Sequence, residues 1–425
     1  MSGENAKNLD TAPKRMKGSD TETPEASTLA RTGAPGQYAP GKAPELSRRR
    51  FLASAGSVTA TAHLLGLGTG LSEAGQAAPG RETGPMVVAD QGSFFVGGRT
   101  VSTPGVWDPN RPRGDGATYY IDHLYAQYQI PTDARRYPLV MTHGNGQTAR
   151  CWETTPDGRE GFNNIFLRRG FSVYLPDSPR RARAGFPSFN GPLGSLEGTQ
   201  VMPDNTTRFG AQQAFVFFRL GAEYPEFYPN TAFPKAGLEQ FFRATIPSVT
   251  EDADVVSDGF VALLEKIGPA VLVAHSQSGP FAMLAAIKSP LVRAIYTYEP
   301  AGMIFPEGEP RPPIVLGDGS VRRGDRQVPA ADFLKLTRIP IHVVYGDNIP
   351  TEPDSLNLRD FRRAQALAGR QFVDVVNRHG GDATFVSLPD EGLVGNTHFM
   401  FFDTNHIQVA DLLSKFLSDK GLDER

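Results

Sequence analysis

Residues 270–275, AVLVAH, form an apolar run that stops at His275, and a polar turn, SQSG, follows at once. A run this short and continuous is typical of a strand buried on both faces of a parallel sheet. Residues 280–289 continue with a helical pattern, and Pro280 stands in the first turn, where its missing N–H does no harm. The order of strand, tight turn and helix predicts an α/β architecture.

The same alternation extends over most of the chain. Further strands are predicted over 135–144, 171–177, 292–300, 339–347 and 383–392, and helices over 161–170, 253–268 and from His406 onward. Two opening segments, 93–101 and 117–130, are predicted to be antiparallel strands, with a turn at Gly97–Gly98 inside the first. Repeated strand–helix units form a mostly parallel sheet flanked by helices, so we expect that fold for 86–184 and 251–425.

Residues 185–250 interrupt this alternation. They show no clean periodicity and are rich in phenylalanine, tyrosine and proline. Long excursions of this kind inside a compact domain are usually lids or binding elements, so we expect a cap insertion over the site. A surface subdomain that packs its own aromatic side chains is the alternative, and both descriptions can hold together.

The N-terminal region carries none of these patterns. Residues 1–46 are polar and too poor in apolar side chains to pack, which predicts a disordered leader. Residues 47–78 contain three arginines at 48–50 before a weakly apolar segment, and small residues at 75–78 offer a cleavage site. We therefore expect a twin-arginine signal peptide, the twin-arginine translocase as partner, and a periplasmic or extracellular destination. An uncleaved membrane anchor is the alternative.

Composition excludes several functional classes. The formal net charge of −3 provides no basic field for nucleic acid or an anionic membrane. The single cysteine, Cys151, excludes an intramolecular disulfide and a metal site of the multi-cysteine kind, and we expect an inert small apolar residue there. The sequence contains no P-loop, no H-E-x-x-H pattern and no dinucleotide fingerprint after a core strand, so neither a cofactor nor a metal is expected.

The turn after His275 matches the surroundings of a nucleophile elbow, which lifts a serine hydroxyl to the carboxyl edge of a sheet. The usual spelling is G-x-S-x-G, whereas the window here is Ala274-His275-Ser276-Gln277-Ser278, with Gly279 one place late. Small residues still occupy both glycine positions, so close packing of strand and helix is retained. The sequence predicts Ser276 as a nucleophile, with a helix-capping serine as the alternative.

A serine hydroxyl needs a base to take its proton, and the base needs an acid to orient it. The base is expected in a loop after the last strand, where His398 lies in EGLVGNTHFMFFD. Two carboxylates end the preceding strands, Glu299 after AIYTY and Asp347 after VVYG. Position within a generic hydrolase favours Asp347, and spacing alone leaves the choice open.

An oxyanion hole needs two N–H groups that point to the place where negative charge develops. The amide of Gln277, directly after the serine, is one candidate. The second is the amide of Asn145, in the loop of residues 142–158 that follows an early strand and contains Gly146. A glycine-rich turn without a catalytic role is the alternative for this loop.

Four pieces of the chain together resemble the secreted bacterial carboxylesterases of the esterase 713 type, within the α/β-hydrolase superfamily: CWETTPDGREGF, AHSQSG, YEP and GNTHFMFFDTNHIQVAD. The similarity extends from residue 92 to the final helix. It implies an α/β-hydrolase fold and a triad of Ser276, Glu299 and His398, and it favours Glu299 over Asp347. The family's loop can carry a cysteine where this chain has Asn145, and the amide role survives that change.

The leading hypothesis is a secreted serine esterase that hydrolyses a small carboxylic ester, or a lactone, through an acyl-enzyme. A second hypothesis keeps the fold and changes the chemistry to cofactor-free perhydrolysis or carbon–carbon bond hydrolysis. A third is a binding protein on the same scaffold, although an intact serine, acid and histidine in the right order argue against it. The sequence leaves the oligomeric state open, including a homodimer.

Overall fold

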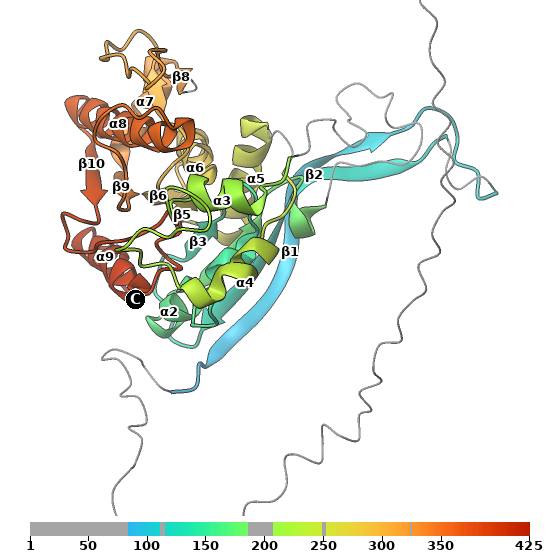
Figure 1. Cartoon of the computed structure of the whole chain (residues 1–425). Coiled ribbons are helices and arrows are strands. Elements are labelled where there is room, and N and C mark those ends of the chain that lie inside the picture. Colours follow the sequence, from blue (N-terminus) through green and yellow to red (C-terminus); the bar gives the residue numbers. More distant parts are fainter. Residues whose placement is uncertain (1–83, 111–114, 186–206, 249–251, 324) are drawn as a thin grey trace, which may run out of the picture. The chain divides into compact units, whose positions relative to one another are not determined.

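The computed structural model describes residues 84–110, 115–185, 207–248, 252–323 and 325–425, which Figure 1 draws as ribbons. All described residues belong to the unit Ala78–Arg425, the second of the chain's two units. The predicted leader (1–46) and signal peptide (47–78) lie outside the described residues, as do 186–206 and 249–250 of the predicted cap. No helix in the described ranges is both long and apolar enough to cross a membrane.

An eight-stranded sheet forms the centre of the second unit, in the order β1-β2-β4-β3-β5-β6-β9-β10. Its strands are β1 (Val88–Ser102), β2 (Thr118–Pro131), β3 (Leu139–Thr142), β4 (Val173–Asp177), β5 (Ala270–His275), β6 (Val292–Tyr298), β9 (Pro340–Tyr345) and β10 (Asp382–Ser387). All pairs from β4 to β10 are parallel, whereas β2 pairs antiparallel with both β1 and β4. The predicted mostly parallel α/β sheet is confirmed.

Helices cover both faces of this sheet (Figure 1). They are α2 (Phe162–Arg168), α3 (Ala211–Phe217), α4 (Leu238–Arg243), α5 (Ala253–Ile267), α6 (Ser278–Lys288), α7 (Ala330–Phe333), α8 (Asn357–Arg378) and α9 (His406–Asp419). In β5, Leu272 packs in one core cluster with α5, α6 and α8, whereas Val271 and Val273 pack with α2 and α9 in another. This two-residue alternation between faces explains why β5 is apolar throughout.

Helix α8 spans 22 residues, and no sequence pattern predicted it. Ala364, Ala368 and Phe372 are buried in the core cluster, but Arg362 and Arg363 are buried beside them and interrupt the apolar period. Smaller elements complete the unit: β7 (Ile304–Pro306) paired with β8 (Arg326–Val328), and the 3₁₀ helices η1 (Ala149–Trp152), η2 (Ala182–Ala184), η4 (Lys235–Gly237) and η5 (Leu336–Arg338).

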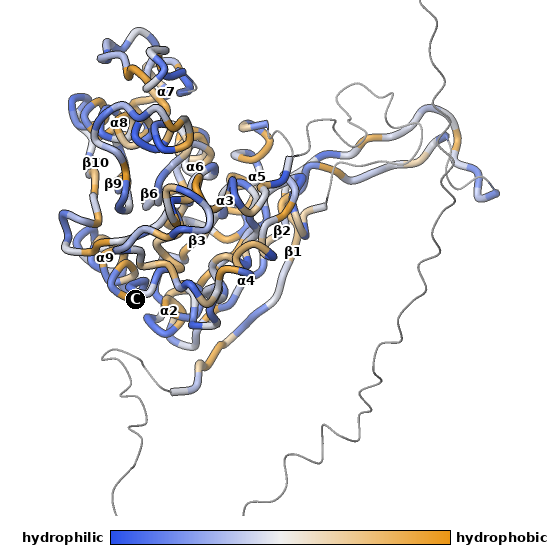
Figure 2. Tube along the Cα trace, viewed as in Figure 1, coloured by the Kyte–Doolittle hydropathy of each residue, from blue (hydrophilic) through white to orange (hydrophobic). Residues whose placement is uncertain are grey.

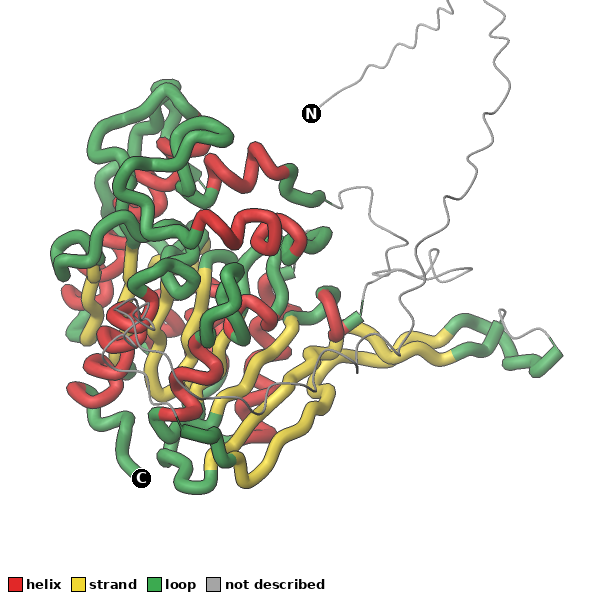
Figure 3. Tube along the Cα trace, turned by 60° about the horizontal axis from the view of Figure 1, so that its bottom comes forward, coloured by secondary structure: helices red, strands yellow, loops and turns green. Residues whose placement is uncertain are grey.

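Strand β1 runs for 15 residues without interruption, so the predicted turn at Gly97–Gly98 is wrong. Its register pairs Gly97 with His123 and Arg99 with Ile121. Gly98 has a φ of 80°, and a Cβ atom there would lie 2.5 Å from the carbonyl oxygen of Ile121. Glycine therefore permits a local irregularity within a continuous strand. Figure 3 shows β1 and β2 as one long hairpin, and Figure 2 shows apolar segments along it.

The described part of the excursion, 207–248, packs onto the core. Phe218 and Phe241 are buried, and their ring centroids lie 4.9 and 5.2 Å from that of Phe399. A bridge between Thr207 and Ser248 closes the segment at its base. These contacts bring the excursion to the loop that precedes α9. Its role as a cap over the site stays a prediction.

Candidate active site

Ser276 lies at the turn between β5 and α6, with a φ of 55°. A serine rarely adopts this left-handed conformation, and such strain is typical of a nucleophile elbow. The turn is held on both sides, because the Ser276 amide donates to Tyr298 O (2.9 Å) while the Ser276 carbonyl accepts from the amides of Gly279 (3.0 Å) and Ala301 (2.9 Å). The sequence context alone predicted this strand–turn–helix geometry.

The two unusual residues after the turn both have a structural reason. A Cβ atom on Gly279 would lie 2.4 Å from Pro300 Cβ, so the glycine is needed one place later than in the usual motif. Ser278 is buried, and its hydroxyl bonds to the Thr142 hydroxyl (2.8 Å) and accepts from the His275 amide (3.0 Å). Its side chain thus ties the ends of β3 and β5 to the start of α6.

The loop after β3 packs directly against the elbow. A Cβ atom on Gly144 would lie 2.8 Å from Ser276 Cβ, so glycine permits the close approach. Next in the loop, Gly146 adopts a φ of 70° and its amide donates to Ser248 Oγ (2.9 Å). Asn145 thus lies between two glycines in the loop that packs against Ser276, and Gln277 is the N-cap of α6. Their roles as oxyanion donors stay predictions.

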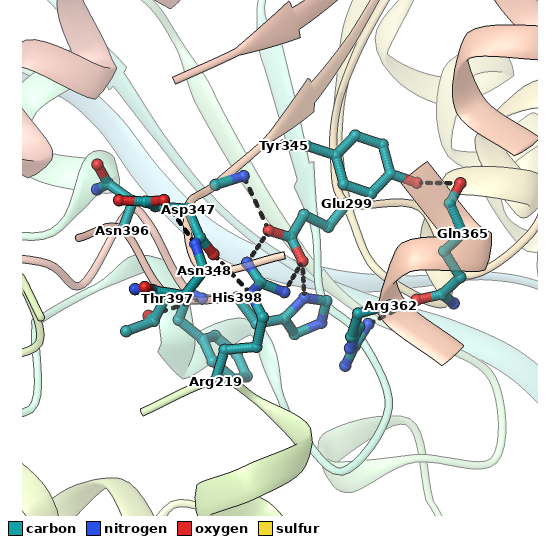
Figure 4. A network of polar contacts seen from close by, with 12 residues as sticks. Arg219, Glu299, Tyr345, Asp347, Asn348, Arg362, Gln365, Asn396, Thr397 and His398 are labelled. Atoms are coloured by element: carbon teal, nitrogen blue, oxygen red, sulfur yellow. Dashed lines mark hydrogen bonds and ion pairs between the residues drawn. The ribbon is translucent and has the colours of Figure 1, made fainter. Parts of the chain in front are cut away.

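The structure separates the two candidate acids. Glu299 follows β6 with a φ of 44°, and its Oε2 lies 2.6 Å from His398 Nδ1, with both side chains fully buried (Figure 4). Asp347 instead accepts from the side chain of Asn230 (3.0 Å) and the amide of Gly395 (2.7 Å). Glu299 therefore contacts the imidazole, whereas Asp347 fixes the loop that carries it.

The geometry around His398 favours a neutral imidazole. Its Nδ1 faces the Glu299 carboxylate, so that nitrogen carries the proton and Nε2 keeps a lone pair. Nε2 is buried and has no hydrogen-bond partner among the described residues. Burial, together with the charge of Arg362, lowers the pKa of His398 to about 3, although Glu299 opposes the shift.

His275 connects the elbow to the His398 loop. Its Nε2 lies 3.1 Å from the backbone carbonyl of His398, so Nε2 carries the proton and donates it. The two imidazole centroids are 4.5 Å apart. Burial lowers the pKa of His275 well below its ordinary value, with a further contribution from His398. His275 is thus a neutral tie between two loops.

Arg219 is a component of the site that sequence reasoning missed. Its guanidinium is 1% exposed and holds Glu299 with two nitrogens, Nη1 to Oε2 at 2.6 Å and Nη2 to Oε1. Burial alone raises the pKa of Glu299, but Arg219 and His398 outweigh it and hold that pKa well below its usual range. An arginine 80 residues upstream in an aromatic stretch gave no local signal of this pairing.

Asp403 was also missed. It is fully buried and accepts from the Thr397 amide (2.7 Å), the Thr397 hydroxyl (3.0 Å) and the Asn396 side chain (3.1 Å). Burial raises the pKa of Asp403 to about 7, against the lowering effect of these hydrogen bonds. The carboxyl group closes the loop immediately before His398.

Two other features lie apart from this cluster. Cys151 is buried in η1, and burial raises the pKa of its thiol well above the ordinary value, as suits an unreactive residue. A cavity of about 840 Å³ lies between the segment at Met86 and the arginine-rich end of α2, and none of Ser276, Glu299 and His398 lines it.

Comparisons with known proteins agree with this fold. The profile of the alpha/beta hydrolase family matches residues 139–412. A solved bacterial esterase is 31% identical, with a TM-score of 0.64, and the match covers 81% of this chain and 99% of the esterase. The "Probable secreted lipase phiG" of a fungal species (strain ATCC 74256) is 27% identical over 328 residues, 70% of this chain and 86% of the lipase. The chain belongs to the alpha/beta hydrolase family.

Proposed function

We propose that the protein hydrolyses carboxylic esters through a serine acyl-enzyme. The observation that carries this proposal is the 2.6 Å contact between Glu299 and His398 Nδ1. His398 Nε2 has no hydrogen-bond partner among the residues that the structure describes, and Ser276 lies on a strained turn after β5. A carboxylate, a neutral imidazole and a serine on an elbow are the parts that acyl transfer requires. The relatives named esterase and lipase support the ester class.

The reaction begins when His398 Nε2 takes the proton of Ser276 Oγ, and Oγ attacks the acyl carbon of the ester. The carbonyl oxygen becomes an oxyanion, which accepts hydrogen bonds from the amides of Asn145 and Gln277. The tetrahedral intermediate collapses, and His398 gives the proton to the departing alcohol. Water then attacks the acyl-enzyme by the same sequence and releases the acid.

Glu299 keeps the proton on His398 Nδ1 and stabilises the imidazolium that forms while Nε2 holds the serine proton. Glu299 stays ionised throughout the cycle and takes up no proton. A lactone is a cyclic ester, so the same steps open its ring and leave acid and alcohol in one molecule.

Export completes the proposal. The arginine triplet at 48–50 and the uncharged segment after it support passage through the twin-arginine translocase. The printed name of the fungal relative, a secreted lipase, supports an exported protein as well. The mature enzyme then acts on esters in the periplasm or outside the cell.

Turnover of 4-nitrophenyl acetate and labelling by a fluorophosphonate test the mechanism. Ser276→Ala should lose both, by several orders of magnitude for turnover. Ser278→Ala is the matched control: it removes the neighbouring hydroxyl and should still be labelled, because that hydroxyl serves packing. Substantial turnover by folded Ser276→Ala contradicts the serine mechanism. Labelling of the wild type without turnover of any ester or lactone contradicts the ester class alone.

A further inference from the structure

The Glu299 carboxylate accepts more hydrogen bonds than the single one from histidine that a catalytic triad requires. Oε2 accepts from His398 Nδ1 and Arg219 Nη1, both at 2.6 Å, and Oε1 accepts from Arg219 Nη2 and from the Gly346 amide (2.9 Å). Arg219 Nε in turn donates to the carbonyl of Asp347 (2.9 Å). All three donor groups of the guanidinium are thus directed at the acid and its immediate surroundings (Figure 4).

The backbone of Arg219 adopts an unfavourable conformation that directs its side chain to Glu299. Helix α3 ends in a Schellman turn, in which the Arg219 amide donates to Val216 O and the Leu220 amide donates to Phe215 O, both at 3.0 Å. The residue in the left-handed position of this turn is usually glycine, but here it is Arg219, with a φ of 60°. Strain of this kind marks a side chain that is required at its position.

We propose that Arg219 is a positioning residue: it fixes Glu299 as an anion in one orientation and reduces the basicity of His398, so that the enzyme stays active at lower pH. This inference rests on the proposed triad of Ser276, Glu299 and His398. Arg219 holds Glu299 and makes no hydrogen bond to His398 within the described part of the chain, although its charge also lowers the pKa of His398.

Opposing charges face the imidazole from several elements. Glu299 at the end of β6, Arg219 after α3 and Arg362 on α8 act on the imidazole, and the His275 ring at the end of β5 lies against it. Asp347 and Asp403 accept hydrogen bonds from the loop that carries His398. An adjacent anion favours the imidazolium and raises the pKa of a histidine, whereas an adjacent cation lowers it. Arg219 compensates the Glu299 anion directly, and His275 is neutral, so Arg219 weakens the effect of the acid on the base.

Removing Arg219 has the same direction of effect by two routes. If Glu299 stays ionised, its uncompensated charge raises the pKa of His398, and the base is protonated at a higher pH. If Glu299 takes up a proton, the imidazole loses its anionic partner until the pH rises far enough to ionise the acid again. Either way, activity is lost at the acidic side of the profile.

The test is the pH dependence of kcat/KM for 4-nitrophenyl butyrate, with folding checked by thermal melting. Arg219→Met should move the acidic limb upward by about 1–3 pH units, the usual effect of one adjacent charge. Arg219→Lys keeps the positive charge but loses the two-nitrogen contact with Glu299. The acidic limb of the pH profile should therefore stay near that of the wild type, while kcat falls. Arg363→Met is the control, because it removes a buried arginine paired with Asp360 (2.6 Å); it should lower stability and leave the limb in place.

A folded Arg219→Met with an unmoved limb overturns the proposal. If that variant does not fold, NMR titration of ¹⁵N-labelled histidine in the wild type decides: His398 should stay neutral well below the ordinary pKa of 6.5, and protonation at about 6.5 or above overturns the proposal. Loss of activity in Ser276→Ala together with an unmoved limb refutes only the role of Arg219. Retained activity in Ser276→Ala refutes the triad itself.

Discussion

The imidazole of His275 donates its Nε2–H to the backbone carbonyl of His398 across 3.1 Å. The residue before the nucleophile candidate thus holds the loop of the base candidate. Both rings are buried, so water cannot replace the hydrogen bond without opening the packing around Phe399, whose ring centroid lies 4.7 Å from that of His275. The distance between elbow and base is therefore set partly by this contact.

His275→Phe keeps a ring in place and removes the donor. The buried carbonyl of His398 then lacks its partner, which should lower the free energy of unfolding by about 1–3 kcal/mol in urea titration. The freed loop should also reduce kcat, with KM little changed. Unaltered kcat and unaltered unfolding would show that the hydrogen bond contributes nothing to the geometry of the site.

Glu299→Gln and Asp347→Asn distinguish the two carboxylates. Glu299→Gln should lower kcat by roughly a thousandfold or more, because the imidazole loses the group that fixes its tautomer. Asp347 accepts hydrogen bonds from the loop that carries His398, whereas Glu299 contacts the imidazole itself. Asp347→Asn should therefore change kcat by less than about tenfold, which corresponds to a free-energy change of about 1.4 kcal/mol. An inactive Asp347→Asn beside an active Glu299→Gln reverses the assignment.

Stability separates these variants as well. Glu299→Gln leaves the buried Arg219 cation without an anion, which should destabilise the protein by about 3–5 kcal/mol. The double variant Glu299→Gln, Arg219→Met removes both charges and should recover part of that loss. Urea unfolding below the melting range measures both. A double variant no more stable than Glu299→Gln alone would mean that the buried ion pair is not the source of the destabilisation.

Asp403 makes the stability of the protein depend on pH. The pKa of its carboxyl is about 7 in the folded state and 3.8 ordinarily. Between these values the unfolded chain has released the proton and the native state keeps it, so the contribution of Asp403 to stability falls as pH rises through that window. Each pKa unit corresponds to about 1.4 kcal/mol.

Asp403→Asn removes this titration and retains acceptor and donor atoms for Thr397. The variant should therefore gain stability relative to the wild type between about pH 4 and pH 8, as measured by urea unfolding at both values. A difference between the two proteins that does not change with pH would contradict the buried, protonated state of Asp403.

Export should depend on the arginine triplet. Changing Arg48, Arg49 and Arg50 to lysine keeps the charge and should leave precursor in the cytoplasm, since the translocase reads the arginine pair as an address. Cell fractionation and immunoblotting follow the mature form, and Ser276→Ala serves as the export control because its signal is intact. Mature protein outside the cytoplasm in normal amount would contradict the twin-arginine route.

Local pattern was enough for most of the sheet. The predicted strand 270–275 and the observed β5 coincide, and β6, β9 and β10 lie within one or two residues of their predicted starts. Strands buried on both faces have apolar side chains at nearly every position, so their signal is contained in a few consecutive residues. The sequence pattern did not predict helix α8, because Arg362 and Arg363 are buried in it and interrupt the apolar periodicity by which a helix is recognised.

The sequence by itself determined the α/β class, the elbow at Ser276 and the loop of His398, because each depends on neighbours along the chain. Only the tertiary structure decided which carboxylate reaches His398. Glu299 and Asp347 both end strands at the same edge of the sheet, and a contact of 2.6 Å depends on side-chain directions that no spacing encodes. The pairing of Arg219 with Glu299 has the same origin: two residues 80 positions apart meet only when α3 packs beside the sheet.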